Sequence, residues 1–128
     1  MRIDTNISGN LTPEERKIIN AHSLNSAKVL SVFPYFHDII PVVRHHHEWY
    51  DGTGYPDRLI GENIPFMSRI IMIADAFVAM TSDRPYRDAL TTDEALSEIE
   101  KNKGIQFDPN LINFFTIVFL EDPGYSPL

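Results

Sequence analysis

The amino-acid sequence predicts an all-α fold, a bundle of about five helices. Two segments, 12–15 and 91–94, carry the capping-box pattern, in which a Thr is followed three residues later by a Glu at the start of a helix. Apolar residues recur at spacings of three and four, as they do along one face of a helix. No segment alternates between apolar and polar residues as a half-buried strand does.

The N-terminal half is predicted to hold two helices and a loop. Pro13 follows the capping Thr12, and proline is favoured at the first helical position, so we expect a helix over 13–33. A second helical pattern covers 35–49, where Pro41 is expected to kink or restart the helix because it lacks a backbone N–H. The segment 51–65 holds three glycines and two prolines, which predicts a loop.

The C-terminal half is predicted to hold three helices. The apolar segment 66–81 forms one, and the second capping box opens another that stops near Gly104. Asp108 and Pro109 start the last helix, which is expected to reach about residue 120. We therefore expect a single domain over residues 1–120 and a C-terminal tail over 121–128.

Composition excludes several classes of protein and of site. The net charge of −7 argues against a polymeric nucleic-acid partner, and the short apolar runs argue against a membrane span. The N-terminus lacks the pattern of a secretion signal, so we expect a cytoplasmic protein. Without cysteine the chain has no disulfide and no thiolate ligand, and any metal site must use histidine and carboxylate groups.

Three of the five histidines are consecutive, in the stretch "RHHHEWYDGTGYP" at 44–56. On an ideal helix, His46 and His47 continue an apolar stripe that ends at Val43, whereas His45 and His37 fall on the polar side. We therefore expect His46 and His47 to point inward and His45 to be solvated. The stripe itself consists of Phe36, Ile39, Ile40 and Val43.

Two more polar residues are predicted on apolar helix faces. His22 shares a face with Ile18, Val29 and Phe33, and Asp75 has apolar neighbours three and four positions away on both sides. One interpretation is a set of hydrogen-bonded polar groups in the core. The other is a metal site, because an unpaired buried carboxylate costs several kcal/mol and a cation would satisfy it.

Histidine and aspartate ligands without sulfur suit iron or manganese, with zinc as an alternative. Two adjacent histidines on a helix project about 100° apart, which suits two neighbouring ions better than one. A pair of ions can clamp the attacking and leaving oxygens of a phosphoryl displacement.

The sequence resembles the HD-GYP phosphodiesterases of bacterial cyclic di-GMP signalling. The resemblance is carried by "NLTPEERKIINAH", "HHHEWYDGTGYP" and "IADAFVAMTSDRPYR", and it extends from about residue 4 to about residue 115. It implies an HD-domain-like helical bundle that binds a divalent metal and acts on cyclic di-GMP. By position, the implied metal ligands are His22, His46, His47 and Asp75.

The same resemblance implies contacts with substrate and with partners. The "SDRPYR" stretch makes Arg84 and Arg87 candidates for contacts with phosphate or guanine, and the Gly-Tyr-Pro loop makes Tyr55 another. Tyr55 has the alternative role of anchoring its loop on the core. The loop is also associated with contacts to diguanylate-cyclase domains. Glu48 either accepts a hydrogen bond from a ligand histidine or solvates the helix end, and Asp51 either orients the loop or starts its turn.

The sequence departs from the family pattern in two places. The "HDIGK"-like segment with the His-Asp pair would precede "NLTPEE", so no catalytic residue is assigned and the N-terminal HD helices are expected to be lacking. His37-Asp38 is the only His-Asp dipeptide, and it lacks the following Gly-Lys. Val78 stands where the family commonly has an Asp. An incomplete bundle would leave an apolar face that self-association or a partner covers.

These observations leave three interpretations of function. The first is a metal-dependent phosphodiesterase that hydrolyses a cyclic dinucleotide by metal-activated water. The second is a non-catalytic module that binds a cyclic dinucleotide or another protein in bacterial signalling. The third is a piece of a larger domain, and the upstream His-Asp segment is the feature that distinguishes the first from the others.

Overall fold

The structure is a computed structural model that describes residues 12–121, without the side chains of residues 119 and 120. The helices confirm the all-α prediction, and no strand occurs within the described range. In chain order the elements are α1 (Pro13–Asn20), α2 (His22–Leu30), η1 (Pro34–Ile39), α3 (Ile40–His45), η2 (Gly61–Asn63), α4 (Phe66–Thr81), α5 (Thr92–Lys101) and α6 (Pro109–Glu121), where η denotes a 3₁₀ helix. Of the tail expected over 121–128, Glu121 belongs to α6 and the rest lies outside the described residues.

Both predicted capping boxes are present. The Thr12 hydroxyl accepts the Glu15 N–H at 3.2 Å, and the Glu15 carboxylate accepts the Thr12 N–H at 2.9 Å. Thr91 and Glu94 make the same pair of bonds at 3.2 and 2.8 Å. Each box satisfies two N–H groups that the first turn of a helix would otherwise leave unpaired.

Two predicted helices are divided in the structure. The first is interrupted at Ala21, although the Ala21 N–H still donates to the carbonyls of Lys17 and Ile18. The second begins as the 3₁₀ helix η1 and continues as α3, with Pro41 in the first turn, which confirms the expected restart. Because α3 ends at His45, the two histidines that follow lie in a turn and not on a helix face.

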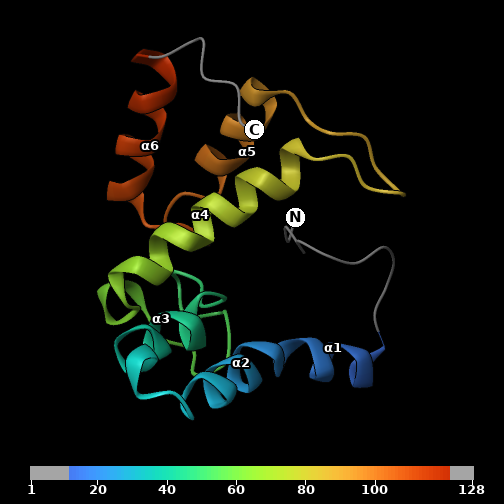
Figure 1. Cartoon of the computed structure of the whole chain (residues 1–128). Helices are drawn as coiled ribbons and strands as arrows, with labels where there is room; N and C mark the ends of the chain where they lie inside the picture. The colour runs from blue at the N-terminus through green and yellow to red at the C-terminus, as the bar shows by residue number, and fades with distance from the viewer. Residues whose placement is uncertain (1–11, 122–128) are drawn as a thin grey trace.

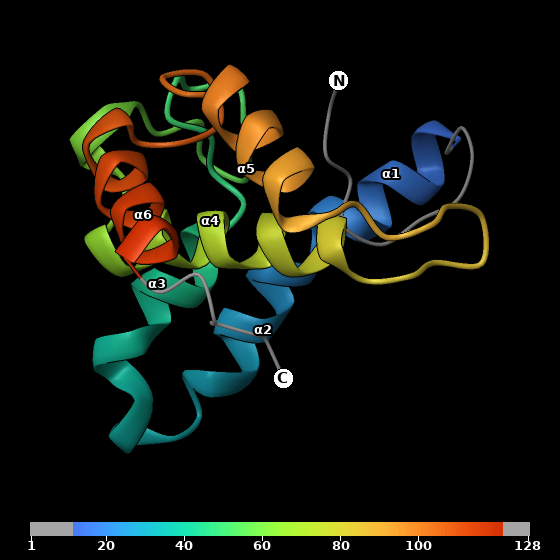
Figure 2. The same cartoon turned by 90° about the horizontal axis from the view of Figure 1, so that it is seen from above.

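Helix α4 crosses the middle of the molecule and separates two groups of helices. In Figure 1, α5 and α6 lie on one side of α4, and α1, α2 and α3 lie on the other. The segment 82–91 forms a loop that projects beyond the C-terminal end of α4 and the start of α5 (Figure 2). None of the helices in residues 12–121 is long and apolar enough to cross a membrane.

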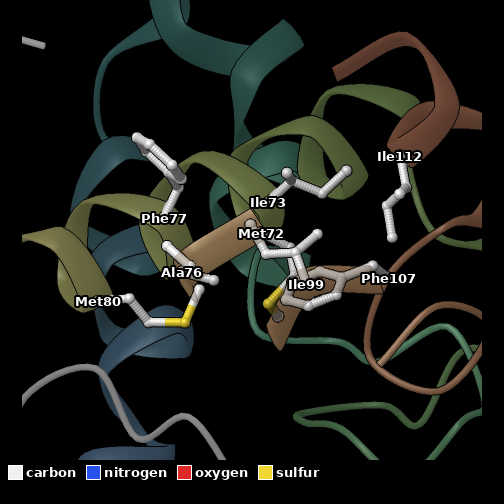
Figure 3. Close-up of a cluster of buried hydrophobic side chains, with 9 residues drawn as sticks. Met72, Ile73, Ala76, Phe77, Met80, Ile99, Phe107 and Ile112 are labelled. Carbon is white, nitrogen blue, oxygen red and sulfur yellow. The ribbon is translucent and has the colours of Figure 1, made fainter. Parts of the chain in front are cut away.

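The hydrophobic core lies where α4 meets α5 and α6. Figure 3 shows the core side chains of α4 facing Ile99 of α5 and Ile112 of α6, with Phe107 between them. Burial of each such large side chain contributes roughly 1.5–3 kcal/mol. The α4 residues of this cluster are Met72, Ile73, Ala76, Phe77 and Met80.

The apolar faces predicted for the first two helices are exposed, so the expectation that they form the core is wrong for the described residues. Ile18 is 72% exposed, Val29 63% and Phe33 51%, and Phe36 and Ile39 are also exposed. Their spacing identifies a face suited to burial, but no described element lies over it. This agrees with the expectation of an uncovered apolar face, and whether self-association covers it stays a prediction.

Candidate metal centre

Three histidines converge in the structure. His22, His46 and His47 each offer a ring nitrogen, and these nitrogens all lie within 4.8 Å of one another. The centroid of the His47 ring lies 4.1 Å from that of His46 and 4.6 Å from that of His22, and the His22 and His46 centroids are 5.2 Å apart. Nitrogen atoms this close together could serve as ligands of one cation.

Two packed elements bring these rings together. His22 is the first residue of α2, and His46 and His47 form the turn after α3, which packs against α2. The expectation that the two neighbouring histidines project about 100° apart assumed a continuing helix, whereas α3 ends at His45. In the turn, the rings of His46 and His47 both lie in the cluster with His22. The geometry of a helix therefore no longer argues for two separate ions.

The His22 environment also differs from the prediction. Its side chain is exposed and does not lie among core residues, because α2 turns a different face toward α3. Ser23 and Ala27 are the buried residues of α2. An exposed imidazole beside two half-buried ones gives the cluster one side open to solvent.

Hydrogen bonding and burial keep the imidazoles suited to binding a metal. His46 Nδ1 lies 2.6 Å from the Val43 carbonyl oxygen, which can only accept, so Nδ1 is the donor and Nε2 is the nitrogen that faces a ligand. Burial, together with the neighbouring His46 and His22, lowers the pKa of His47 to about 3. Burial and His46 also lower the pKa of His22, against an opposing effect of Asp75. Neutral imidazole is the form that ligates metals.

Asp75 lies near this cluster but outside the converging set. Its charge acts on His22, yet it is not among the groups whose ligand atoms all lie within 4.8 Å of one another. Asp75 is exposed, so the prediction that it points into the core is wrong. Helix α4 is apolar around most of its circumference, so spacing alone could not tell which face is buried. Val78, one turn further along, is exposed as well.

The Gly-Tyr-Pro loop folds back onto the histidines. The Tyr55 ring stacks on His47, with centroids 5.1 Å apart and an interplanar angle of 19°, and the Tyr55 N–H donates to the His47 carbonyl at 3.2 Å. Gly54 is buried against the same turn, where a Cβ would lie 2.2 Å from Trp49 N and 2.6 Å from Glu48 Cα. Only glycine permits so close an approach of two backbone segments.

Glu48 and His45 hold this loop, which the sequence alone did not indicate. Glu48 is 2% exposed, and its carboxylate accepts the N–H groups of Asp57 at 2.7 Å and Leu59 at 3.1 Å. His45 Nδ1 lies 3.3 Å from Glu48 Oε1, and the His45 side chain is only 13% exposed, so the expectation of a solvated His45 is wrong. Asp51 accepts from the Thr53 N–H and hydroxyl, as expected of a residue that starts a turn.

The two candidate substrate arginines belong to the projecting segment after α4. Arg84 and Arg87 exchange backbone hydrogen bonds of 2.9 and 3.1 Å. Arg87 Nη2 also donates to the Ala79 carbonyl at 2.7 Å, so part of this guanidinium fastens the segment to α4. Arg87 therefore has a structural role beside its proposed one.

The residues present fit a divalent metal. The donor set consists of three imidazoles with a carboxylate nearby, and one ligand histidine has its second nitrogen fixed by a carbonyl. Such a second contact is typical of metal-bound histidine. Nitrogen and oxygen donors suit iron, manganese or zinc and do not select among them.

Similar proteins are found among cyclic dinucleotide phosphodiesterases. The chain is 38% identical over 107 residues to "Cyclic di-GMP phosphodiesterase response regulator RpfG" of Xanthomonas campestris pv. campestris (strain 8004), covering 82% of this chain and 28% of that protein. It is 37% identical over 109 residues to "Cyclic di-GMP phosphodiesterase" of Thermotoga maritima, covering 84% of this chain and 30% of that protein. The chain thus spans less than a third of the length of these relatives.

A solved structure has the same fold. The crystal structure of a cyclic GMP-AMP specific phosphodiesterase of V. cholerae (V-cGAP3) matches 94% of this chain and 31% of its own, with a TM-score of 0.71 and 22% sequence identity. The family model described as "HD domain" matches residues 4–111. The chain belongs to the HD domain family.

Proposed function

We propose that this chain forms part of a metal-dependent phosphohydrolase that acts on a cyclic dinucleotide. The observation that carries the proposal is the convergence of three histidine nitrogens within 4.8 Å, in a chain of the HD domain family. The relatives named above are phosphodiesterases of cyclic di-GMP, and the solved neighbour is one for cyclic GMP-AMP. We extend this substrate class, and not one particular dinucleotide, to this chain.

His22, His46 and His47 would hold the metal, with Asp75 as the nearby carboxylate. Iron or manganese is the proposed ion, and zinc is the alternative. A divalent ion at such a site supplies Lewis acidity toward a phosphoryl oxygen and makes hydroxide available from water near neutral pH. The pKa of His47, lowered to about 3, keeps its imidazole neutral at working pH, so that protons do not compete for the ligand nitrogen.

Other residues of the chain would handle the substrate. Tyr55 covers one face of His47, which limits access of water from that side and leaves the tyrosine at the edge of the cluster. Arg84 and Arg87 are proposed to contact phosphate or guanine, because a planar guanidinium pairs with both. No general acid or base is assigned among the described residues.

The test combines metal content with turnover. We expect the purified protein to bind close to stoichiometric iron or manganese and to hydrolyse cyclic di-GMP or 3'3'-cGAMP, as followed by chromatography of the linear products. Protein with His46→Ala serves as the control for contaminating phosphodiesterase. A protein that binds no metal and turns over neither dinucleotide in added manganese or iron would contradict the proposal.

A non-catalytic module is the second candidate function. It is favoured by the position of Asp75 outside the histidine set, which leaves the metal fewer ligands, and by the exposed Val78 one turn away, which is apolar and offers the substrate no hydrogen bond. Cyclic dinucleotide binding without turnover, in metal-loaded protein, would favour this module over the enzyme. A diguanylate-cyclase domain as partner and a cytoplasmic location stay predictions.

A further inference from the structure

Glu48 is a buried carboxylate that directly follows the histidine turn. It is 2% exposed, and an ionised carboxylate at that depth costs several kcal/mol unless hydrogen bonds satisfy it. Oε1 accepts the Asp57 N–H at 2.7 Å and lies 3.3 Å from His45 Nδ1, while Oε2 accepts the Leu59 N–H at 3.1 Å. Both carboxylate oxygens are therefore occupied by donors of this chain.

These bonds fix the returning part of the Gly-Tyr-Pro loop. Asp57 and Leu59 follow Tyr55 within four positions, and the Tyr55 N–H is itself bound to the His47 carbonyl at 3.2 Å. On the outer side, the Asp57 carboxylate accepts two bonds from the Arg44 guanidinium, at 2.8 and 3.0 Å. Tyr55 is thus held by its own backbone bond and by the bonds of the residues that follow it, and together these fix its ring over His47.

We infer that Glu48 is a positioning residue for the metal centre: by clamping residues 57 and 59, it holds the Tyr55 ring on His47 and so keeps His47 directed at His22 and His46. The inference rests on the proposed function, because it assigns Glu48 to the same histidine cluster. Loss of a group that orients a metal ligand typically weakens metal affinity about 10–100-fold.

A second metal site is the competing explanation of the same residues. One ligand atom each from His45, Glu48 and Asp57 also lies within 4.8 Å of the others. A cation there would have to share the Glu48 carboxylate with two backbone N–H groups, and it would sit beside the guanidinium that already bonds both oxygens of Asp57. A clamp made of hydrogen bonds accounts for every one of these contacts.

The test compares Glu48→Gln with a matched control, using the full chain and Co²⁺ as the probe. Glutamine keeps the size of the side chain but turns an N–H₂ group toward one of the two backbone donors. We expect Co²⁺ affinity, followed by visible absorption and calorimetry, to fall about 10–100-fold. Glu62→Gln removes the same charge from an exposed position in η2 and should bind Co²⁺ like the unchanged protein.

A metal-free readout separates this inference from the proposed function. In the apo protein, the ring current of Tyr55 should displace the His47 imidazole resonances, and Glu48→Gln should move them toward their positions in Tyr55→Leu. The double variant should lose no more Co²⁺ affinity than Tyr55→Leu alone, because both changes act through one contact. If the unchanged protein binds no Co²⁺, the proposed function fails, and these resonances alone decide the role of Glu48.

Unchanged His47 resonances together with unchanged Co²⁺ affinity in a folded Glu48→Gln would overturn the inference. If that variant does not melt cooperatively, Tyr55→Leu replaces it, because it removes the stacking contact and leaves the Glu48 bonds in place. Tyr55→Leu should then show the displaced resonances and the weaker binding, and the absence of both would also overturn the inference.

Discussion

The phenol ring of Tyr55 stacks nearly parallel on the imidazole of His47, at 19° and a centroid distance of 5.1 Å. The two residues are eight positions apart, and the buried Gly54 lets the chain between them return to its own starting point. The loop that gives the sequence its most specific motif and the turn that carries the candidate ligands are therefore one structural unit.

Replacement of His46 is expected to remove most of the metal bound at the cluster. His46→Ala takes away one of three converging nitrogens, so we expect metal content to fall well below that of the unchanged protein, by at least about 10-fold in affinity. Elemental analysis after dialysis against buffered Mn²⁺ or Zn²⁺ measures the metal content. His37→Ala, on the exposed η1 helix, is the control and should leave metal content unchanged. Equal losses in both variants would remove the case for a histidine centre.

The stability of the metal-free protein should depend on pH through His47. Its pKa is about 3 when folded and about 6.5 when unfolded, so below pH 6.5 the unfolded chain binds a proton that the folded chain does not. The free energy of unfolding should therefore fall as the pH drops toward 3, by roughly 1–2 kcal/mol between pH 7 and pH 5. Urea unfolding in EDTA measures this change. His47→Gln should flatten the dependence, and an unchanged slope in that variant would contradict the assignment.

Gly54→Ala should destabilise the loop strongly. Its Cβ would lie 2.2 Å from Trp49 N and 2.6 Å from His47 O, and backbone atoms cannot move aside as a flexible side chain does. We expect a loss of about 1–3 kcal/mol or more in unfolding free energy, together with weaker metal binding. Gly61→Ala is the comparison, because a Cβ there meets nothing closer than 3.9 Å and only its φ of +59° opposes the change. That variant should lose about 1 kcal/mol and keep its metal affinity.

The ion pair between Arg69 and Asp108 should matter more for stability than the ion pairs on the surface. Asp108 has a side chain only 2% exposed, and Arg69 joins α4 to the start of α6 through it while also donating to the Ile64 carbonyl. Arg69→Ala leaves the buried carboxylate without its cation, although the Asn110 N–H still donates to it at 2.9 Å, and loss of one partner of a buried ion pair typically costs about 3–5 kcal/mol. Lys101→Ala breaks an exposed pair with Glu98 and should cost less than about 1 kcal/mol. Urea denaturation of the two variants, side by side, measures the difference.

Local signals in the sequence predicted the helices well. The two capping boxes, the bounds of α4 and the restart at Pro41 each depend on contacts within a few residues, and the structure confirms them. The interruption at Ala21 has no such local signal, and we find no physical reason for it in the surrounding residues. The burial of the apolar faces was predicted least well, because periodicity identifies an apolar face of a helix but does not show which element, if any, covers it.

The candidate site was predicted only in part. The pattern singled out His22, His46 and His47, and the structure brings them together, but for a different reason than inward-pointing helix faces. The role of Glu48 arises from the backbone N–H groups of Asp57 and Leu59, which lie 9 and 11 positions further along the chain. Sequence spacing cannot reveal such contacts, because they exist only once the loop has returned.

The division of the ligand set between α2 and the turn after α3 has a consequence for folding. His22 and His47 lie 25 positions apart, and the chain between them includes the exposed apolar residues of α2 and η1. An ion shared by the two histidines would close that segment into a ring, much as a cross-link does, and would restrict the unfolded chain. The melting temperature of this half of the protein would then rise with metal concentration, as the occupancy of the site does.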